Sequence, residues 1–208
     1  MTRPAARRRV TAHHGYHHGD LRRALLDAAR SVLVQAGPEG CSLREVARRA
    51  GVSHAAPYHH FPSRQALLGA LAAEGYDELD RAMAEAQAAA PPEPEAQLVA
   101  VGMGYFLLAQ RQPALFRLMI RAEHLAPPPG PAVAADGACP GPYGRLRTAL
   151  ARLLGHPATG AQAHLCWGAV HGLSLLALDG GLGVPPAALA AHAREAISLL
   201  AAGLAPAR

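Results

Sequence analysis

The stretch from 42 to 64, SLREVARRAGVSHAAPYHHFPSR, restricts the fold of this 208-residue chain more than any other segment. Ser42 stands three residues before Glu45, which is the spacing of a capping box: the serine hydroxyl accepts from the Glu45 backbone N–H, and the carboxylate reaches back to the N–H of Ser42. Gly51 follows the helix so begun, and glycine is the residue that best adopts the left-handed turn at a helix end. We therefore expect a short helix that ends in a glycine turn.

A second short helix is expected after this turn. Ser53 is placed to cap a helix over His54–Phe61, and Ser63, after Pro62, is placed to cap a longer one. Two short helices joined by a three-residue turn are typical of a helix-turn-helix. Pro57 would be the fourth residue of the second helix, and because proline has no N–H to donate, we expect a tight or 3₁₀-like first turn.

The rest of the chain carries the three-to-four spacing of helices, and only 4% of its residues are aromatic, which favours an all-α fold. From this period and from stop signals such as Gly37-Pro38, we expect further helices at about 20–36, 64–87, 95–111, 113–124, 142–155, 159–179 and 186–204. The Pro- and Gly-rich stretch 126–142 predicts a mobile loop. The domains expected are a flexible basic and His-rich arm at 1–18, a three-helix helix-turn-helix domain at 19–75 and a larger helical domain at 76–208.

The positive charge of the chain is concentrated in its first third. All 20 basic residues are arginine; residues 1–64 hold 11 of them against four acids, a net charge of +7, whereas residues 65–208 have a net charge of −2. This asymmetry is typical of a nucleic-acid-binding module joined to a part with a different role. In the alternative interpretation some arginines are only the charged residues that any solvent-exposed helix face carries. This applies to Arg22, Arg30, Arg44, Arg48 and Arg49.

Missing motifs argue against several classes of protein. Cys41, Cys139 and Cys166 form no CxxC pair, which disfavours a zinc ribbon or a disulfide framework and fits a reducing cytoplasm. The basic N-terminus is not followed by an apolar stretch of about 7 to 15 residues, so we expect neither export nor a membrane partner. The sequence has no Walker loop, GxSxG, HExxH or strand-linked GxGxxG, so we expect neither an enzyme nor a cofactor.

The run SLREVARRAGVSHAAPYHHFPSRQALLGAL, within residues 20–72, resembles the DNA-binding domain of the TetR family of transcriptional regulators. The resemblance rests on Val46, Ala47, the Ala50-Gly51-Val52-Ser53 turn, Tyr58, Phe61, Ser63, Arg64, Leu67 and Leu68. It implies a recognition helix at His54–Phe61 in the major groove, with Tyr58 and Arg64 on flanking phosphates. Base contacts would then come from the exposed side chains of this helix. The DNA-contacting residues expected are Ser42, Ser53, His54, Ala55, Tyr58, His59 and Arg64, joined by His17 and His18 of the arm.

Four histidines precede the first helix in AHHGYHHGDL. A metal site would need converging imidazoles oriented by neighbouring groups, and an arm that contains Gly15 and Gly19 lacks the rigidity for this. A DNA-proximal arm needs less, because the free N–H groups at a helix start favour an anion such as a phosphate. We expect His17 and His18 to add contacts there and Arg7–Arg9 to follow the DNA backbone or a minor groove, with an inert tract as the alternative.

Beyond residue 98 the segments are apolar on more than one face, so they must bury against each other or against a partner. CWGAVHG, with Trp167, His171 and Gly172, resembles the C-terminal domain of a TetR subgroup named for a Trp-His-Gly signature, and YHHGDL and YFLLAQRQPALFRLMI fit it too. The resemblance implies a homodimer through the last two helices and a small-molecule pocket among the middle ones. Candidate lining residues are Met103, Tyr105, Phe106, Phe116, Met119, Trp167 and His171. In the alternative interpretation Trp167 is a core residue and His171 bonds a carbonyl.

The residues themselves also support a dimer, because one short recognition helix contacts too few bases by itself. Gly168 and Gly172 would let another helix approach closely. An apolar stripe lies beside them, formed by Leu165, Ala169, Leu173 and Leu176. Cys166 could sense oxidants or electrophiles or be an inert thiol.

The sequence therefore predicts a cytoplasmic, homodimeric DNA-binding regulator that acts on a palindromic operator, as a repressor that a small-molecule ligand releases. One alternative keeps the DNA-binding domain and makes the larger domain an oligomerisation module without a ligand. The alternative from another class is a small metal-dependent hydrolase that uses His164, Cys166 and His171. Its spacing is unfavourable, since residues two apart on a helix point to different faces.

Overall fold

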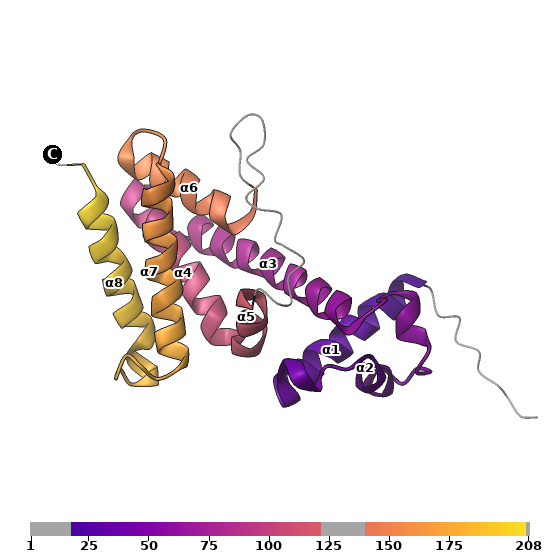
Figure 1. Cartoon of the computed structure of the whole chain (residues 1–208). Coiled ribbons are helices and arrows are strands. Elements are labelled where there is room, and N and C mark those ends of the chain that lie inside the picture. Colours follow the sequence, from indigo (N-terminus) through magenta and orange to yellow (C-terminus); the bar gives the residue numbers. More distant parts are fainter. Residues whose placement is uncertain (1–17, 122–139, 207–208) are drawn as a thin grey trace, which may run out of the picture.

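Helices are the only regular elements among residues 18–121 and 140–206, the residues that the computed structural model describes (Figure 1). In chain order they are α1 (His18–Gly40), α2 (Leu43–Ala50), the 3₁₀ helix η1 (Ala56–His59), α3 (Arg64–Ala88), α4 (Pro94–Arg111), α5 (Pro113–Ile120), α6 (Gly141–Leu154), α7 (Gly160–Leu178), the 3₁₀ helix η3 (Pro186–Ala188) and α8 (Leu189–Leu204). The all-α prediction is confirmed. Most of the arm, with His17, and most of the loop predicted at 126–142 lie outside the described residues.

Both glycines predicted to stop helices have a positive φ, although α1 continues past the first of them to Gly40. Gly37 (φ 67°) interrupts the regular backbone of α1, and Gly51 (φ 69°) closes α2. At the start of α2 the Ser42 hydroxyl accepts from the Glu45 N–H at 3.1 Å. The other half of the predicted capping box is wrong: the Glu45 carboxylate accepts from the Arg48 guanidinium at 2.5 and 2.7 Å instead. The Ser42 N–H donates to the Gly40 carbonyl at 2.8 Å, and the two-point pair with Arg48 engages the carboxylate.

The recognition helix predicted over His54–Phe61 is wrong in extent and type. Only Ala56–His59 are helical; they form η1, whose N-cap is Ala55 rather than Ser53 and which has no side-chain capping bond. The tight turn expected from Pro57 is confirmed, because proline cannot donate the hydrogen bond that an α-helix needs at this position. Pro57 is buried. Its carbonyl accepts from the N–H groups of His60 and Phe61 at 3.0 and 2.8 Å. The turn is thus anchored from the inside.

The helix α3 is continuous over 25 residues and contributes to both halves of the chain. The Ser63 hydroxyl caps it by accepting from the Ala66 N–H at 3.1 Å, as the sequence predicted. Figure 1 shows α1 and α2 gathered at one end of α3 and the later helices around the rest of it. The predicted domain boundary between 75 and 76 falls inside α3 and stays a prediction.

The helix α4 lies at the centre of the second half, where it packs on α3, α6, α7 and α8. Most of its residues from Leu98 to Ala109 are buried, on every side of the helix. A Cβ on Gly104 would lie 2.6 Å from the Met83 Cα of α3, and a Cβ on Gly102 would lie 3.0 Å from the Ile197 side chain of α8. These glycines therefore permit close approach on two sides of α4, and at Gly104 the contact is with backbone.

Replacing Gly104 by alanine is expected to lower the free energy of unfolding by about 1 to 3 kcal/mol, because the added methyl overlaps the α3 backbone. Urea denaturation followed by the fluorescence of Trp167, the one tryptophan of the chain, measures the change. Gly160→Ala is the matched control, since a Cβ there meets nothing within 4 Å. A Gly104→Ala protein as stable as wild type would show that α3 and α4 can separate at no cost.

Candidate functional site

The turn around η1 exposes several of the side chains predicted to contact DNA. These are His54, Ala55, Tyr58 and His59, and Tyr58 is 55% exposed. A tyrosine hydroxyl can donate to phosphate, imidazoles can donate or accept at base edges, and an alanine methyl offers an apolar contact. Ser42 and Ser53 are also exposed, although the Ser42 hydroxyl is used in capping α2.

Buried side chains hold this exposed turn in place. Pro57 and Phe61 point into the core, and the Arg22 guanidinium of α1 lies 5.5 Å from the centroid of the Phe61 ring. Val46 of α2 is fully buried in the same core cluster. The outward side chains are therefore presented by a turn whose inner side cannot move freely, which preorganises them for contact with a partner.

Arg64 begins α3 close to this turn, but its guanidinium is already bonded within the chain. It donates to the Pro38 carbonyl at 2.6 Å and to the Glu39 carboxylate at 3.4 Å. These bonds brace the start of α3 against the last turn of α1. The phosphate contact of Arg64 stays a prediction, and the sequence did not indicate the bracing role, because Pro38 lies 26 residues away.

The arginines of α2 differ in how far they are engaged. Arg48 is paired with Glu45, and Arg49 donates to the Ser31 hydroxyl of α1 at 2.7 Å. Arg44 is exposed and has no ion pair with another described residue. A count of charges in the sequence could not show which of these three arginines has a partner within the chain. Their engagement makes Arg44 the better candidate for a phosphate contact, since its guanidinium would not have to leave a partner.

A cluster of six rings lies in the second half, contributed by α4, α5, α6 and α7. This aromatic cluster consists of Tyr105, Phe116, Tyr143, His164, Trp167 and His171. Tyr105 meets Phe116 and Trp167 edge to face, with ring centroids 5.6 and 5.1 Å apart. Tyr143 lies 5.7 Å from Trp167 and 5.8 Å from His164. Four of the predicted pocket residues therefore meet here.

A hydrogen bond sets the protonation of the middle of this cluster. The Tyr105 hydroxyl oxygen lies 2.7 Å from His171 Nδ1. Burial raises the pKa of Tyr105 and lowers the pKa of His171, so near neutral pH the phenol is protonated and the imidazole is neutral. Where the phenol donates to Nδ1, the proton of the neutral imidazole lies on Nε2, from which it can donate to a ligand. The partner of His171 Nδ1 is thus a phenol rather than a carbonyl.

Three of the predicted pocket residues lie outside the aromatic cluster. Phe106 and Met119 are 0% and 1% exposed and belong to the core. Tyr105 and Phe116 belong to it too, at 3% and 1%, but only these two have ring contacts within the aromatic cluster. Met103 lines a separate cavity of about 670 Å³ between the end of α3, the first half of α4 and α8. Tyr143 was missed, because nothing local in the sequence shows that α6 packs against this face of α7, and His164 was not among the predicted lining residues.

The hydrolase alternative finds no support in the geometry. No group of three or more His, Cys, Asp or Glu side chains converges as a metal site among residues 18–121 and 140–206. His164 is exposed and Cys166 is buried, so the two point to different faces of α7. Burial also raises the pKa of the Cys166 thiol, which disfavours the thiolate that a redox or electrophile sensor needs.

The outward side of the last two helices is uncovered and apolar. This outer α7–α8 face includes Leu165, Leu176 and Leu199, which are 55%, 51% and 70% exposed. A Cβ on Gly168 or Gly172 would meet nothing within 4 Å, so both glycines leave open space for another chain.

One segment of the described chain, Pro186–Leu204, is long and apolar enough to cross a membrane. In the structure, 17% of an 18-residue stretch of it is buried. Length and composition alone are weak evidence for a span. The segment also carries Arg194 and Glu195, and charged side chains oppose insertion into lipid.

Replacing His171 by glutamine is expected to remove part of the acid sensitivity of the fold. Because burial lowers the folded-state pKa of His171 below its ordinary 6.5, its contribution to stability is complete above that pH and is lost as the pH falls through the folded pKa. Urea denaturation at about pH 7.5 and about pH 5.5 should show a larger loss for wild type than for His171→Gln. His192→Gln, at an exposed position on α8, is the control. Equal losses in all three proteins would contradict the assignment.

Two family models match the chain. The model described as "Bacterial regulatory proteins, tetR family" matches residues 25–71, which include α2, η1 and the start of α3. The model described as "Tetracyclin repressor-like, C-terminal domain" matches residues 98–200, which include most of the later helices. Each half of the chain is therefore matched by a model of the same kind of regulator.

Individual proteins show the same likeness. HTH-type transcriptional regulator BetI of Rhizobium meliloti (strain 1021) is 36% identical over 107 residues, 51% of this chain and 45% of BetI, so the match spans about half of either protein. The solved structure of a protein of unknown function from Rhodococcus sp. RHA1 is 32% identical, with a TM-score of 0.71 over 93% of this chain and 100% of that one. Multidrug binding protein EbrR, complexed with imidazole, is 21% identical with a TM-score of 0.62 over 93% and 97% of the two chains, and shares the fold. The chain belongs to the TetR family of bacterial regulatory proteins.

Proposed function

We propose that this protein is a DNA-binding transcriptional regulator that reads a palindromic operator as a homodimer, as a repressor that a small molecule releases. The observation that carries the proposal is the turn around η1, where His54, Tyr58 and His59 are exposed above the buried Pro57 and Phe61. A small protruding element of this kind fits a major groove. The net charge of +7 over the first 64 residues supplies general attraction to phosphates. The half-length match to a helix-turn-helix regulator supports the same conclusion.

The homodimer is supported by the outer α7–α8 face. Exposed leucines and open glycines there leave apolar surface that another copy of the chain can bury. A single η1 turn reaches too few bases for specificity, whereas two turns related by a two-fold axis read two half-sites about one helical turn apart. A DNA partner also implies a cytoplasmic protein.

The ligand is expected at the aromatic cluster. Its rings offer stacking and edge-to-face contacts to a flat molecule, and the Nε2 proton of His171 offers one donor to an acceptor atom. The fold shared with EbrR, whose structure holds imidazole, supports a small ring compound as a ligand. Phe116 lies on the short helix α5, so a ligand that displaces its ring would favour a different placement of α5.

A second candidate keeps DNA binding but makes the large domain an oligomerisation module without a ligand. The favouring observation is that three cavities of the described chain, which lie beside α3, α4, α6 and α8, are not lined by Tyr105 or His171. A true ligand raises the melting temperature by mass action in a thermal-shift screen, whereas this second candidate predicts no such ligand.

Purified protein is expected to bind DNA from directly upstream of its own gene at least about a thousandfold more tightly than random DNA, because groove contacts add to phosphate attraction. Fluorescence anisotropy at two salt concentrations measures both affinities. His59→Ala should change the order of preference among single-base variants of the site, while the control His192→Ala should not. Equal affinity for the upstream and random DNA, with or without salt dependence, would count against a sequence-specific regulator of its own gene.

The substitution Leu165→Arg should convert the dimer to a monomer, because it puts a charge on the outer α7–α8 face. Sedimentation equilibrium measures the mass, and operator affinity should fall in parallel. Val34→Arg is the matched control, since Val34 is 70% exposed on α1, away from that face. A Leu165→Arg protein that remains dimeric would place the interface elsewhere.

A further inference from the structure

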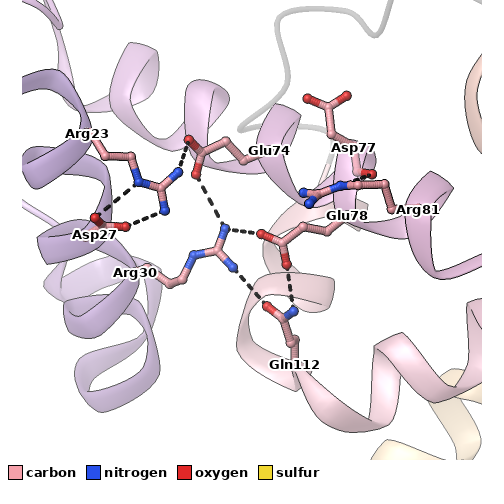
Figure 2. Close-up of polar contacts among 8 residues, drawn as sticks. All are labelled: Arg23, Asp27, Arg30, Glu74, Asp77, Glu78, Arg81 and Gln112. Carbon is pink, nitrogen blue, oxygen red and sulfur yellow. Dashed lines mark hydrogen bonds and ion pairs between the residues drawn. The ribbon is translucent and has the colours of Figure 1, made fainter. Parts of the chain in front are cut away.

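Three polar side chains close a ring of hydrogen bonds between α1, α3 and the junction of α4 with α5, as Figure 2 shows. Arg30 of α1 donates to one carboxylate oxygen of Glu78 at 2.5 Å, and Gln112 donates to the other at 2.6 Å. Arg30 also donates to the side-chain oxygen of Gln112 at 3.0 Å. Each member of this Arg30–Glu78–Gln112 triangle is therefore bonded to both others.

The Arg23 ion pairs beside the triangle are more exposed. Glu74, by contrast, is 24% exposed and differs from Glu78 in its longer contact with Arg30. Arg23 bonds Asp27 and Glu74, and Glu74 lies 3.4 Å from Arg30 (Figure 2). The Arg23 side chain is 60% exposed, whereas Arg30 and Glu78 are 25% and 21% exposed. Exposed ion pairs contribute little to stability, and the Arg30–Glu74 contact is long at 3.4 Å, so the shorter bonds of the triangle are the part of this network that holds the helices in a set geometry.

The triangle keeps its charges near neutral pH. Burial by itself would raise the pKa of Glu78, but the hydrogen bonds from Arg30 and Gln112 outweigh it and lower that pKa. Arg30 Nε is buried and has no hydrogen-bond partner among the described residues, so the two terminal nitrogens hold the guanidinium. Removal of any one member would leave a shielded charge or amide with unsatisfied bonds.

The triangle joins α1, which belongs to the DNA-reading end of the chain, to α3 and to the start of α5. The helix α1 packs on α3 and α5, and its buried residues, such as Leu25, Leu26 and Val32, are apolar. Apolar contacts have no preferred direction, whereas hydrogen bonds do. The triangle therefore determines how α1 is oriented on α3 more strongly than the area of contact suggests.

Gln112 also ties the triangle to the helix that carries Phe116. It is the single residue between α4 and α5 and caps both. Its N–H donates to the Leu108 carbonyl, and its carbonyl accepts from the Phe116 N–H, both at 2.9 Å. A rotation of α5 would therefore displace the side chain that Arg30 and Glu78 hold.

We propose that Arg30, Glu78 and Gln112 are positioning residues for operator binding. They set the angle of α1, and with it the η1 turn, on the body formed by α3 and α5, without touching DNA themselves. The inference rests on the proposed DNA-binding function. Two reading turns must keep a set spacing to enter successive half-sites, so loosening the triangle lowers operator affinity and leaves the general attraction to phosphates unchanged.

The chain contains a matched control for this proposal on the same helix. Arg145 of α6 donates to both carboxylate oxygens of Asp80 at 2.9 Å and to the Gln87 side chain at 3.4 Å. The exposed fractions of Arg145 and Asp80, 27% and 30%, are close to those of Arg30 and Glu78. This second group of an arginine, an acid and a glutamine joins α6 to α3 and leaves α1 untouched.

The test compares Gln112→Met with Gln87→Met, because neither change alters the charge of the protein. Arg30→Met and Arg145→Met form the second pair. Anisotropy titrations on operator and on random DNA, at several salt concentrations, are combined with melting temperatures of each full-length protein. Gln112→Met and Arg30→Met should bind the operator roughly 3- to 30-fold more weakly, while the two control variants keep wild-type operator affinity.

Other readouts separate positioning from direct contact. Gln112→Met should keep the wild-type affinity for random DNA and the wild-type dependence of that affinity on salt. If the salt dependence were weaker in Arg30→Met than in Arg145→Met, Arg30 would be a phosphate contact, and the inference would be overturned. Unchanged operator affinity in Gln112→Met and Arg30→Met, or an equal loss in the controls, would also overturn it. If Gln112→Met does not fold, Gln112→Glu, which keeps the bond to Arg30 but repels Glu78, replaces it. A wild-type protein without operator preference overturns the proposed function itself.

Discussion

The contact of α3 with α4 at Gly104 is the constraint on which the rest of the structure depends. The helix α4 is buried on nearly every side, so α3, α6, α7 and α8 are placed by their packing against it. A side chain at 104 would meet the α3 backbone, and glycine lets the two helices approach closely. Because α3 continues without a break to the DNA-reading end, the same contact links the core of the second half to the first.

The DNA-reading end depends on a different constraint. Pro57 lacks the N–H that would extend an α-helix, so the chain forms a short 3₁₀ turn and then leaves it at His60. The hydrogen bonds that a longer helix would form are lost, but burial of the proline ring and of Phe61 beneath the turn compensates for them. Exposed imidazoles and a phenol are thus held on a small, anchored surface rather than along a longer helix.

Electrostatics connect the two ends. Acidic side chains of α3 form ion pairs with arginines of two other helices. Glu74 and Glu78 pair with Arg23 and Arg30 of α1, and Asp80 pairs with Arg145 of α6. Arg23 and Arg30, two of the arginines counted in the first third, are therefore engaged within the protein. A count of basic residues indicates the class of partner, but the guanidiniums without an internal partner are the better candidates for contact with it.

The sequence by itself determined the all-α class, the helix end at Gly51, the Ser63 cap, and the family resemblance, because periodicity, capping and turn preferences act within a few residues of the chain. It failed where local rules compete, as at Glu45, whose carboxylate pairs with a guanidinium rather than with a backbone amide. Only the tertiary structure decided that Tyr105 meets His171, 66 residues away, and that Arg30 meets Gln112, 82 residues away. Such pairs depend on how whole helices pack, and no spacing within one helix encodes that.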